Sequence, residues 1–232
     1  LSDLDILVPF GSLNQAVSAL APLGYRKIDR ATSAEDEWLT AMFFDGICVT
    51  RPRGLPVELH TSFLGGLGDP QAAVRDVWAC AIELKGDGWC VRGLLPEHAF
   101  ITAACHLYRN HARALPYLKD VADLALLFRT IEARGDWDGM WNSARRWGVE
   151  CEIRGIGAFL NAYTPIYVPG CDGAAPAFRP ADLVYALERL EGRGRLTEGL
   201  AARLRYIGRL PGWGSRMRFV AGLVFPRPGF LR

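Results

Sequence analysis

The sequence predicts an α+β protein with a small mixed β-sheet and an all-helical C-terminal half. A strand, a helix and a second strand are expected within residues 1–28, and short strand-like segments continue to residue 62. From residue 96 onward, apolar residues recur every three or four positions, which is the period of a helix. This order of elements favours an α/β core at residues 1–95 and a helical domain at residues 96–232.

The composition is that of a soluble globular protein. Of the 232 residues, 50% are hydrophobic and 22% are charged, so a buried core is expected and global disorder is not. No apolar run approaches the roughly 20 residues that span a bilayer, so we expect no membrane partner. The six cysteines stand at no zinc-finger or Cys-x-x-Cys spacing and indicate reduced thiols in a cytoplasmic protein.

Positive charge is concentrated in residues 192–232. This segment holds nine arginines and one acid, Glu198, so its net charge is +8, against −6 for residues 1–191. Because apolar residues alternate with the arginines at helical spacing, we interpret the segment as an amphipathic helix with a solvated face. A surface for nucleic acid is a weaker alternative, as is one for an acidic partner or a phosphate-bearing ligand.

The first eight residues, Leu1 to Val8, predict a rigid, buried strand that carries two carboxylates. Alternation places Asp3 and Asp5 on one face of this strand and its apolar residues on the other. Such a pair repels itself unless a cation lies between the groups, and Mg²⁺ accepts two oxygen ligands together with substrate phosphates. The pattern suggests metal-assisted phosphoryl or nucleotidyl transfer, with a solvated strand end as the ordinary alternative.

A later candidate strand carries a third carboxylate. Residues 57–62 alternate so that Glu58 and His60 share one face. If this strand lies next to the first, Glu58 and His60 approach Asp3 and Asp5. An exposed glutamate is the alternative for Glu58, and a hydrogen-bonded structural histidine, or one that orients Glu58, is the alternative for His60.

The remaining elements follow from periodicity, caps and turn residues. Asp45-Gly46 predicts a two-residue hairpin turn, because both of its positions favour positive φ. Ser12 is expected to cap the first helix. Expected strands are residues 25–28, 38–44, 47–51 and 89–91. Expected helices are residues 12–22, 72–81, 97–109, 115–129, 137–147, 150–162, 180–190, 197–207 and 215–225.

Several segments, taken in order, resemble one protein family. They are Ser2-Asp3-Leu4-Asp5-Ile6-Leu7-Val8, Leu23-Gly24-Tyr25, Val57-Glu58-Leu59-His60, Leu118-Lys119-Asp120-Val121-Ala122-Asp123-Leu124 and Val224-Phe225-Pro226-Arg227-Pro228-Gly229-Phe230-Leu231-Arg232. Their combination is similar to the uncharacterised bacterial nucleotidyltransferase family of the DNA polymerase beta-like nucleotidyltransferase superfold. In that superfold a phosphate-holding helix precedes the Asp-x-Asp strand. This chain begins after that point, and with Leu, so we expect it to be truncated at its N-terminus.

The resemblance implies functional roles for residues in both halves of the chain. Glu58 would help to deprotonate an acceptor hydroxyl. The ligands of Mg²⁺, or of Mn²⁺, would be Asp3, Asp5 and Glu58. The residues that contact the nucleotide or the acceptor would be His60, Lys119 and Asp120.

Ordinary structural roles are available for several of these polar residues. Asp123 lies four residues after Lys119, so an intrahelical ion pair is the alternative explanation for that lysine. The spacing of His98, His106 and His111 does not match that of zinc ligands, so we expect no zinc site there.

We therefore expect a Mg²⁺-dependent nucleotidyltransferase-like enzyme. It would move a nucleoside monophosphate from an NTP to a hydroxyl group of a small molecule or a protein. Two alternatives stay open at this point. One is a non-catalytic binding partner in a biosynthetic gene cluster, and the other is a toxin-type nucleotidyltransferase that acts on RNA, which the basic residues 192–232 prompt.

Overall fold

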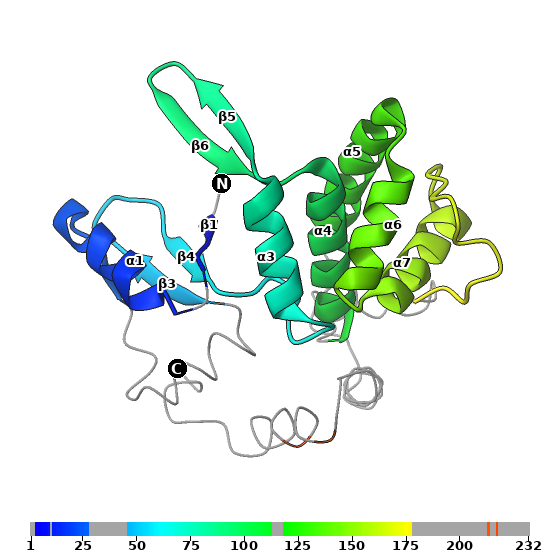
Figure 1. Ribbon diagram of the computed structural model, residues 1–232, viewed down its shortest axis with the longest axis horizontal. Helices are drawn as coiled ribbons and strands as arrows, with labels where there is room; N and C mark the ends of the chain where they lie inside the picture. Colours follow the sequence, from blue (N-terminus) through cyan, green and yellow to red (C-terminus); the bar gives the residue numbers. More distant parts are fainter. Residues whose placement is uncertain are drawn as a thin grey trace, which may run out of the picture. The chain divides into compact units, whose positions relative to one another are not determined.

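The structure is a computed structural model of an α+β protein, which confirms the predicted class. It describes residues 3–9, 11–27, 46–112 and 118–177, together with Trp213 and Met217. The chain forms two compact units. The sheet unit comprises Leu1–Gly66 with Pro211–Arg232, and the helical unit comprises Leu67–Leu210. In Figure 1 the strands of the sheet unit are blue and cyan, and the helices of the helical unit run from cyan to yellow.

The sheet unit contains a four-stranded mixed sheet in the order β1-β4-β3-β2. Its strands are β1 (Leu4–Leu7), β2 (Arg26–Lys27), β3 (Ile47–Thr50) and β4 (Val57–His60). Strand β1 runs parallel to β4, and the other neighbouring pairs are antiparallel. Among the described strands β1 lies at an edge of the sheet. The expectation of a buried opening strand is therefore wrong, and the Asp5 side chain is 69% exposed.

Alternation along the strands gives the sheet one apolar face. Helix α1 (Leu13–Leu20) packs against this face, continues into the 3-10 turn η1 (Ala21–Leu23) and ends at Gly24, whose φ is 83°. Ser12 stands at the cap position of α1, but its side chain makes no capping hydrogen bond within the described residues, contrary to expectation. The buried strand residues are Val8, Ile47, Val49, Val57 and Leu59, and α1 contributes Leu13, Ala16, Val17 and Leu20. Burial of each larger side chain contributes roughly 1.5–3 kcal/mol. This free energy determines which face of the sheet turns towards the core.

Position 46 requires glycine because the backbone of β4 lies very close to it, and not because the chain turns there. Its φ lies outside the left-handed region, so the predicted positive φ is wrong at this position. A Cβ atom on residue 46 would lie 2.6 Å from the Leu59 carbonyl oxygen and 3.1 Å from His60 Nδ1. The backbone of residue 46 therefore packs directly against β4. Asp45 and the strand expected at residues 38–44 lie outside the described residues.

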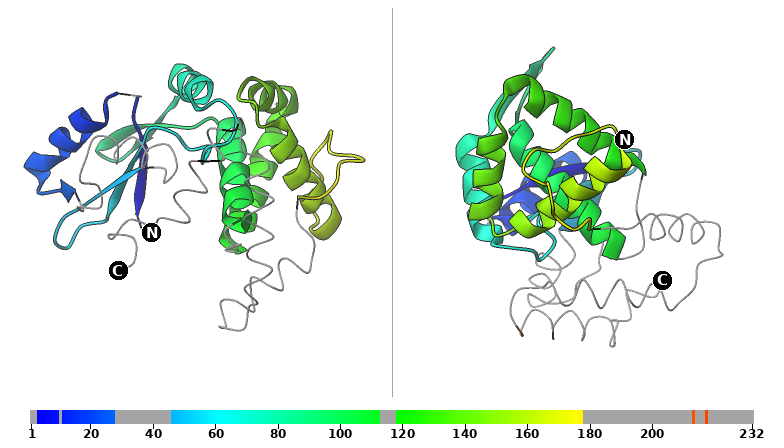
Figure 2. Two further views of the ribbon diagram at one scale, coloured as in Figure 1. Left: turned by 90° about the horizontal axis from the view of Figure 1, so that it is seen from below. Right: turned by 90° about the vertical axis from the view of Figure 1, so that its right-hand side faces the viewer.

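Helix α4 (Pro96–Ala112) is the centre of the helical unit. It packs against α5 (Leu118–Arg134), α6 (Trp137–Arg146) and α7 (Glu150–Tyr163), while α3 (Pro70–Cys80) packs against α6. Figure 2 shows α4 beside α6 and α7, in green to yellow. Large fully buried side chains of this unit are Phe100, Ile101, Leu107, Leu124, Ile131, Met140, Trp147 and Phe159. The expected helices at 72–81, 97–109, 115–129, 137–147 and 150–162 are thus confirmed with shifted ends.

Only one of the two strands in the hairpin between α3 and α4 was predicted. Strand β6 (Trp89–Gly93) extends the expected strand at 89–91, and it pairs with β5 (Ile82–Gly86), which periodicity did not reveal. The dipeptide Asp87-Gly88 joins the two strands, and the φ of Gly88 is 79°. This dipeptide is the sequence signal that could have located β5, because Asp-Gly is a preferred two-residue hairpin loop.

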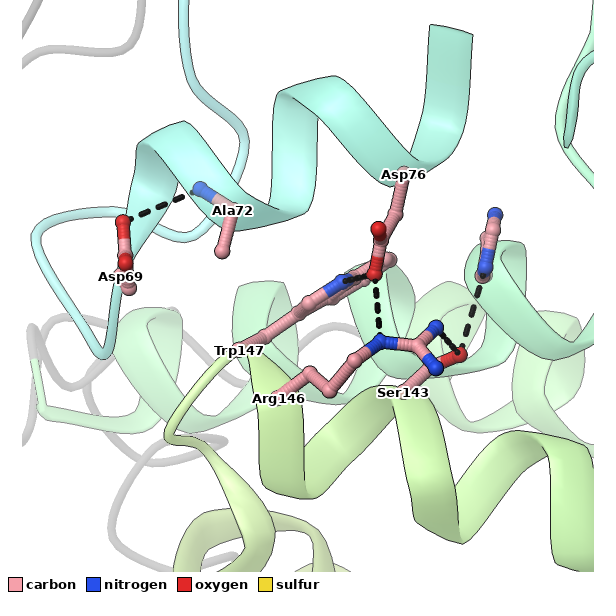
Figure 3. A network of polar contacts seen from close by, with 7 residues as sticks. Asp69, Ala72, Asp76, Ser143, Arg146 and Trp147 are labelled. Carbon is pink, nitrogen blue, oxygen red and sulfur yellow. Dashed lines mark hydrogen bonds and ion pairs between the residues drawn. The ribbon is translucent and has the colours of Figure 1, made fainter. Parts of the chain in front are cut away.

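A polar network ties α3 to the end of α6 (Figure 3). The Asp76 carboxylate accepts hydrogen bonds from Arg146 Nε at 2.9 Å and from the buried Trp147 Nε1 at 2.8 Å. Ser143 Oγ accepts a bond from Arg146 at 3.2 Å and lies 3.4 Å from His98 Nε2. Because a hydroxyl oxygen has two lone pairs and one proton, Ser143 can accept from Arg146 and also share a hydrogen bond with His98. The His98 ring also packs on Trp147, with ring centroids 4.9 Å apart.

The segment after α7 folds back onto that helix without forming a helix itself. The Asn161 side chain donates to the Val168 carbonyl at 3.2 Å and accepts from the Val168 N–H at 2.6 Å. The helices expected at 180–190, 197–207 and 215–225 lie outside the continuously described ranges. Within those ranges, every helix is too short or too polar to cross a membrane.

Candidate functional site

Three polar side chains gather on the face of the sheet opposite the apolar core. The parallel register places Asp5 of β1 directly opposite Glu58 of β4, and Leu7 opposite His60. Residues in register on neighbouring strands point to the same face. Since Val57 and Leu59 of β4 are buried in the core, alternation turns Glu58 and His60 to the other face, where Asp5 also lies.

His60 is the centre of this group. Its Nε2 atom lies 2.8 Å from Asp5 Oδ1 and 3.7 Å from Glu58 Oε2. The first distance is that of a charge-assisted hydrogen bond, whereas the second is too long for a hydrogen bond. The His60 side chain is only 13% exposed, but those of Asp5 and Glu58 are 69% and 41% exposed. The carboxylates are therefore accessible to a ligand, while the imidazole lies against the sheet.

The donor atoms of these residues are close enough to surround one metal ion. One atom each from Asp5, Glu58 and His60 can be chosen so that all lie within 4.8 Å of one another. Ligands that bind one ion at about 2.1 Å stand roughly 3 to 4 Å apart, so the spacing fits. Exposed carboxylate oxygens are the donors that Mg²⁺ and Mn²⁺ prefer. The residues present thus fit a divalent cation of this kind.

Asp3 is not a member of this group. It directly precedes β1, and alternation puts it on the same face as Asp5. The neighbouring N–H of Leu4 donates to the Pro56 carbonyl at 2.9 Å, so the backbone is already held against the chain entering β4. The carboxylate of Asp3 is not among the three donors that lie within 4.8 Å of one another. The structure brings together Asp5, Glu58 and His60.

Lys119 and Asp120 belong to the helical unit, in the first turn of α5. Lys119 Nζ lies 2.8 Å from Asp123 Oδ2, so the intrahelical ion pair that the spacing suggested is present. The Lys119 side chain is nevertheless 79% exposed. Asp120 is buried, and its Oδ1 lies 3.7 Å from Nδ1 of His106 on α4.

Among the described residues, His98 and His106 of α4 belong to no cluster of possible metal ligands. The side chain of His111 lies outside the described residues. His98 is buried, and burial lowers the pKa of its imidazole below the ordinary value, with a smaller opposing effect from Asp76. His106 faces Asp120 instead.

The contact between His60 and Asp5 is the feature of the site that the sequence did not reveal. Sequence spacing offered Glu58, two residues away on the same strand, as the group that His60 would orient. The parallel register instead sets Asp5 diagonally across from His60, within hydrogen-bond reach. Only the pairing of β1 with β4 contains this information, because nothing in either strand alone specifies the register.

Comparison with known proteins identifies one related group. A family model described as uncharacterised nucleotidyltransferase matches residues 1–165, which include the sheet, the site and helices α3 to α7. No curated protein and no solved structure matches the chain significantly.

Proposed function

Because the chain belongs to the uncharacterised nucleotidyltransferase family, we propose that it moves a nucleoside monophosphate from an NTP to a hydroxyl acceptor. The observation that carries this proposal is the accessible pair of carboxylates, Asp5 and Glu58, side by side on neighbouring strands. In nucleotidyl transfer the protein supplies geometry and charge stabilisation more than covalent chemistry. Two exposed carboxylates fixed by a strand register meet that requirement.

A divalent cation, Mg²⁺ or Mn²⁺, would be held by Asp5 and Glu58, together with Asp3. When bound, such an ion neutralises charge on the phosphates and on the leaving group. The acceptor oxygen attacks the α-phosphorus, the bond from that phosphorus to the bridging oxygen breaks, and pyrophosphate leaves. Glu58 accepts the proton of the acceptor hydroxyl, for which its partial exposure gives access.

Lys119 is proposed to contact the phosphates of the nucleotide. One of its partners is Asp123, and an exposed i,i+4 pair of this kind contributes only about 0.3–0.5 kcal/mol. Asp120 is buried, and we do not assign it a direct contact with the nucleotide. Lys119→Ala is expected to raise KM for NTP with little change in kcat, because the lysine contributes binding and no bond rearrangement.

The proposed activity is tested by transfer of label from α-labelled NTP. Each of the four NTPs is incubated with the protein, Mg²⁺ and a panel of hydroxyl acceptors that includes the protein itself, and pyrophosphate is measured in parallel. Asp5→Asn and Glu58→Gln should each reduce both signals at least about 100-fold, because each removes a charge that holds the ion.

Glu83→Gln is the matched control. Glu83 is an exposed glutamate of β5 in the helical unit, paired with Lys85 at 2.8 Å. The Glu83→Gln variant should transfer label from NTP as well as the wild type does. Equal labelling by wild type, Asp5→Asn and Glu58→Gln would contradict the assigned carboxylates. A wild-type protein that transfers no label and releases no pyrophosphate with any of the four NTPs would contradict the activity.

A further inference from the structure

His60 has two ring nitrogens in very different surroundings. Nε2 points to the carboxylate of Asp5 at 2.8 Å. Nδ1 is buried and has no hydrogen-bond partner among the described residues. The backbone of Gly46 covers this edge of the ring, since a Cβ on residue 46 would lie only 3.1 Å from Nδ1. The two nitrogens therefore cannot exchange roles without cost.

The position of the ring proton follows from this asymmetry. With the proton on Nε2, His60 donates a hydrogen bond to a carboxylate, which contributes about 1.5–3 kcal/mol. With the proton on Nδ1, that bond is lost, the lone pair of Nε2 faces the oxygen of Asp5, and a buried N–H has no acceptor. The neutral ring should therefore carry its proton on Nε2.

This proton decides what His60 can do at the metal site. A nitrogen that carries a proton has no lone pair for a metal ion. Binding an ion through Nε2 would move the proton to Nδ1, yet histidine ligands almost always donate their other N–H to an acceptor, and none of the described residues provides one here. Proximity alone includes His60 among the possible ligands, but its hydrogen bonding excludes it.

We propose that His60 is a positioning residue: its Nε2–H donates to Asp5 and fixes that carboxylate for an ion bound by oxygen atoms alone. The inference rests on the proposed metal site and adds which metal ions that site selects. A carboxylate has about four acceptor positions, and the hydrogen bond from His60 uses one of them. An all-oxygen site selects Mg²⁺ or Mn²⁺, whereas an imidazole ligand would favour zinc and later transition metals.

The tautomer is tested directly by NMR on the metal-free, full-length protein labelled with ¹⁵N-histidine. Long-range ¹H–¹⁵N correlations at pH 8 distinguish protonated from unprotonated ring nitrogens, and His60→Gln identifies the His60 signals by their loss. The expected pattern has the proton on Nε2. A proton on Nδ1 would overturn the proposal. Because this experiment needs neither metal nor turnover, its outcome is independent of whether nucleotidyl transfer is found.

The ligand role is tested by pulsed EPR of Mn²⁺ bound to the same ¹⁵N-labelled protein. We expect no ¹⁵N coupling from His60, and a coupling that disappears in His60→Gln would make the residue a ligand. Affinity for Mn²⁺ supplies a second measurement. His60→Gln keeps an N–H donor and should stay within about 3-fold of wild type, while His60→Leu should weaken binding about 10-fold, the equivalent of one such hydrogen bond.

Thr50→Val is the control for the substitution of a polar residue in this sheet. Thr50 is the last residue of β3 and is not one of the clustered residues Asp5, Glu58 and His60. Its Mn²⁺ affinity should equal that of wild type. Equal losses in His60→Gln and His60→Leu, with Thr50→Val unchanged, would mean that the imidazole itself is needed and would overturn the positioning role.

Discussion

His98 illustrates how burial sets the chemistry of a single residue. It is almost completely removed from solvent on α4, packs on Trp147 and meets Ser143 through Nε2. Two charged groups, Asp76 of α3 and Arg146 of α6, act on the pKa of His98 in opposite directions. Burial is the larger effect and lowers the pKa of His98, so the folded protein holds the neutral imidazole.

This residue makes the stability of the helical unit depend on pH. The unfolded chain binds a proton at His98 near pH 6.5, whereas the folded chain does so only at lower pH. The stabilisation is therefore fully present above about pH 6.5 and is lost as pH falls through the lowered pKa of the folded state. Urea unfolding between pH 8 and pH 5 should show this decline, and His98→Gln should flatten it. Parallel profiles for the two proteins would contradict the assignment.

At the scale of elements, the helices were easier to predict than the strands. Five helices of the helical unit lie where apolar residues repeat at three- and four-residue spacing, because a long amphipathic pattern has few alternatives. Strand β5 was missed because Ile82 and Leu84 alternate with Glu83 and Lys85 over only five residues, most of them exposed. Gly46 was assigned to a turn because its spatial neighbour, Leu59, is distant in sequence.

Glycines that share a backbone conformation differ in what surrounds them. Gly68 and Gly135 have φ values of 55° and 68°. A Cβ on Gly135 would meet open space, but a Cβ on Gly68 would overlap the carbonyl oxygen of Trp147. That oxygen also accepts the N–H of Asp69 at 2.7 Å, so the contact joins the start of α3 to the end of α6.

Alanine substitution should separate the two effects. Gly135→Ala forces an alanine into the left-handed conformation without a steric clash. It should lower the free energy of unfolding by about 1–2 kcal/mol. In Gly68→Ala the new Cβ must also displace the backbone at Trp147. This substitution should lower the free energy of unfolding by about 3 kcal/mol or more. Urea denaturation at pH 8 measures both. Equal losses would show that the space at Gly68 does not matter.

At the scale of the whole molecule, a bound nucleotide should stabilise the folded chain through the candidate site. A ligand at 100 times its dissociation constant adds about 2.7 kcal/mol to the stability of the state that binds it. The melting temperature should therefore rise with NTP and Mg²⁺ together, less with either alone, and not in Asp5→Asn. Glu83→Gln should behave as wild type, and a shift preserved in Asp5→Asn would place the nucleotide elsewhere.

The site was predicted as a set of residues but not as an arrangement. The alternation of Asp3, Asp5, Glu58 and His60 follows from local sequence, since strand period alone sets the face of each residue. Their distances depend on which strands become neighbours and in which register, a property of the whole sheet. Hence the hydrogen bond between His60 and Asp5 appears only in three dimensions.

The parallel pairing of β1 with β4 also sets the order in which the site assembles. The β3–β4 hairpin closes over residues 51–56, whereas β1 reaches β4 only across residues 8–56. By loop-closure entropy the longer connection costs about 2 kcal/mol more. Folding should therefore place Glu58 and His60 on a formed hairpin first and add Asp5 last. The affinity for metal would then appear only when the edge strand docks, so the final step of folding is also the step that creates the site.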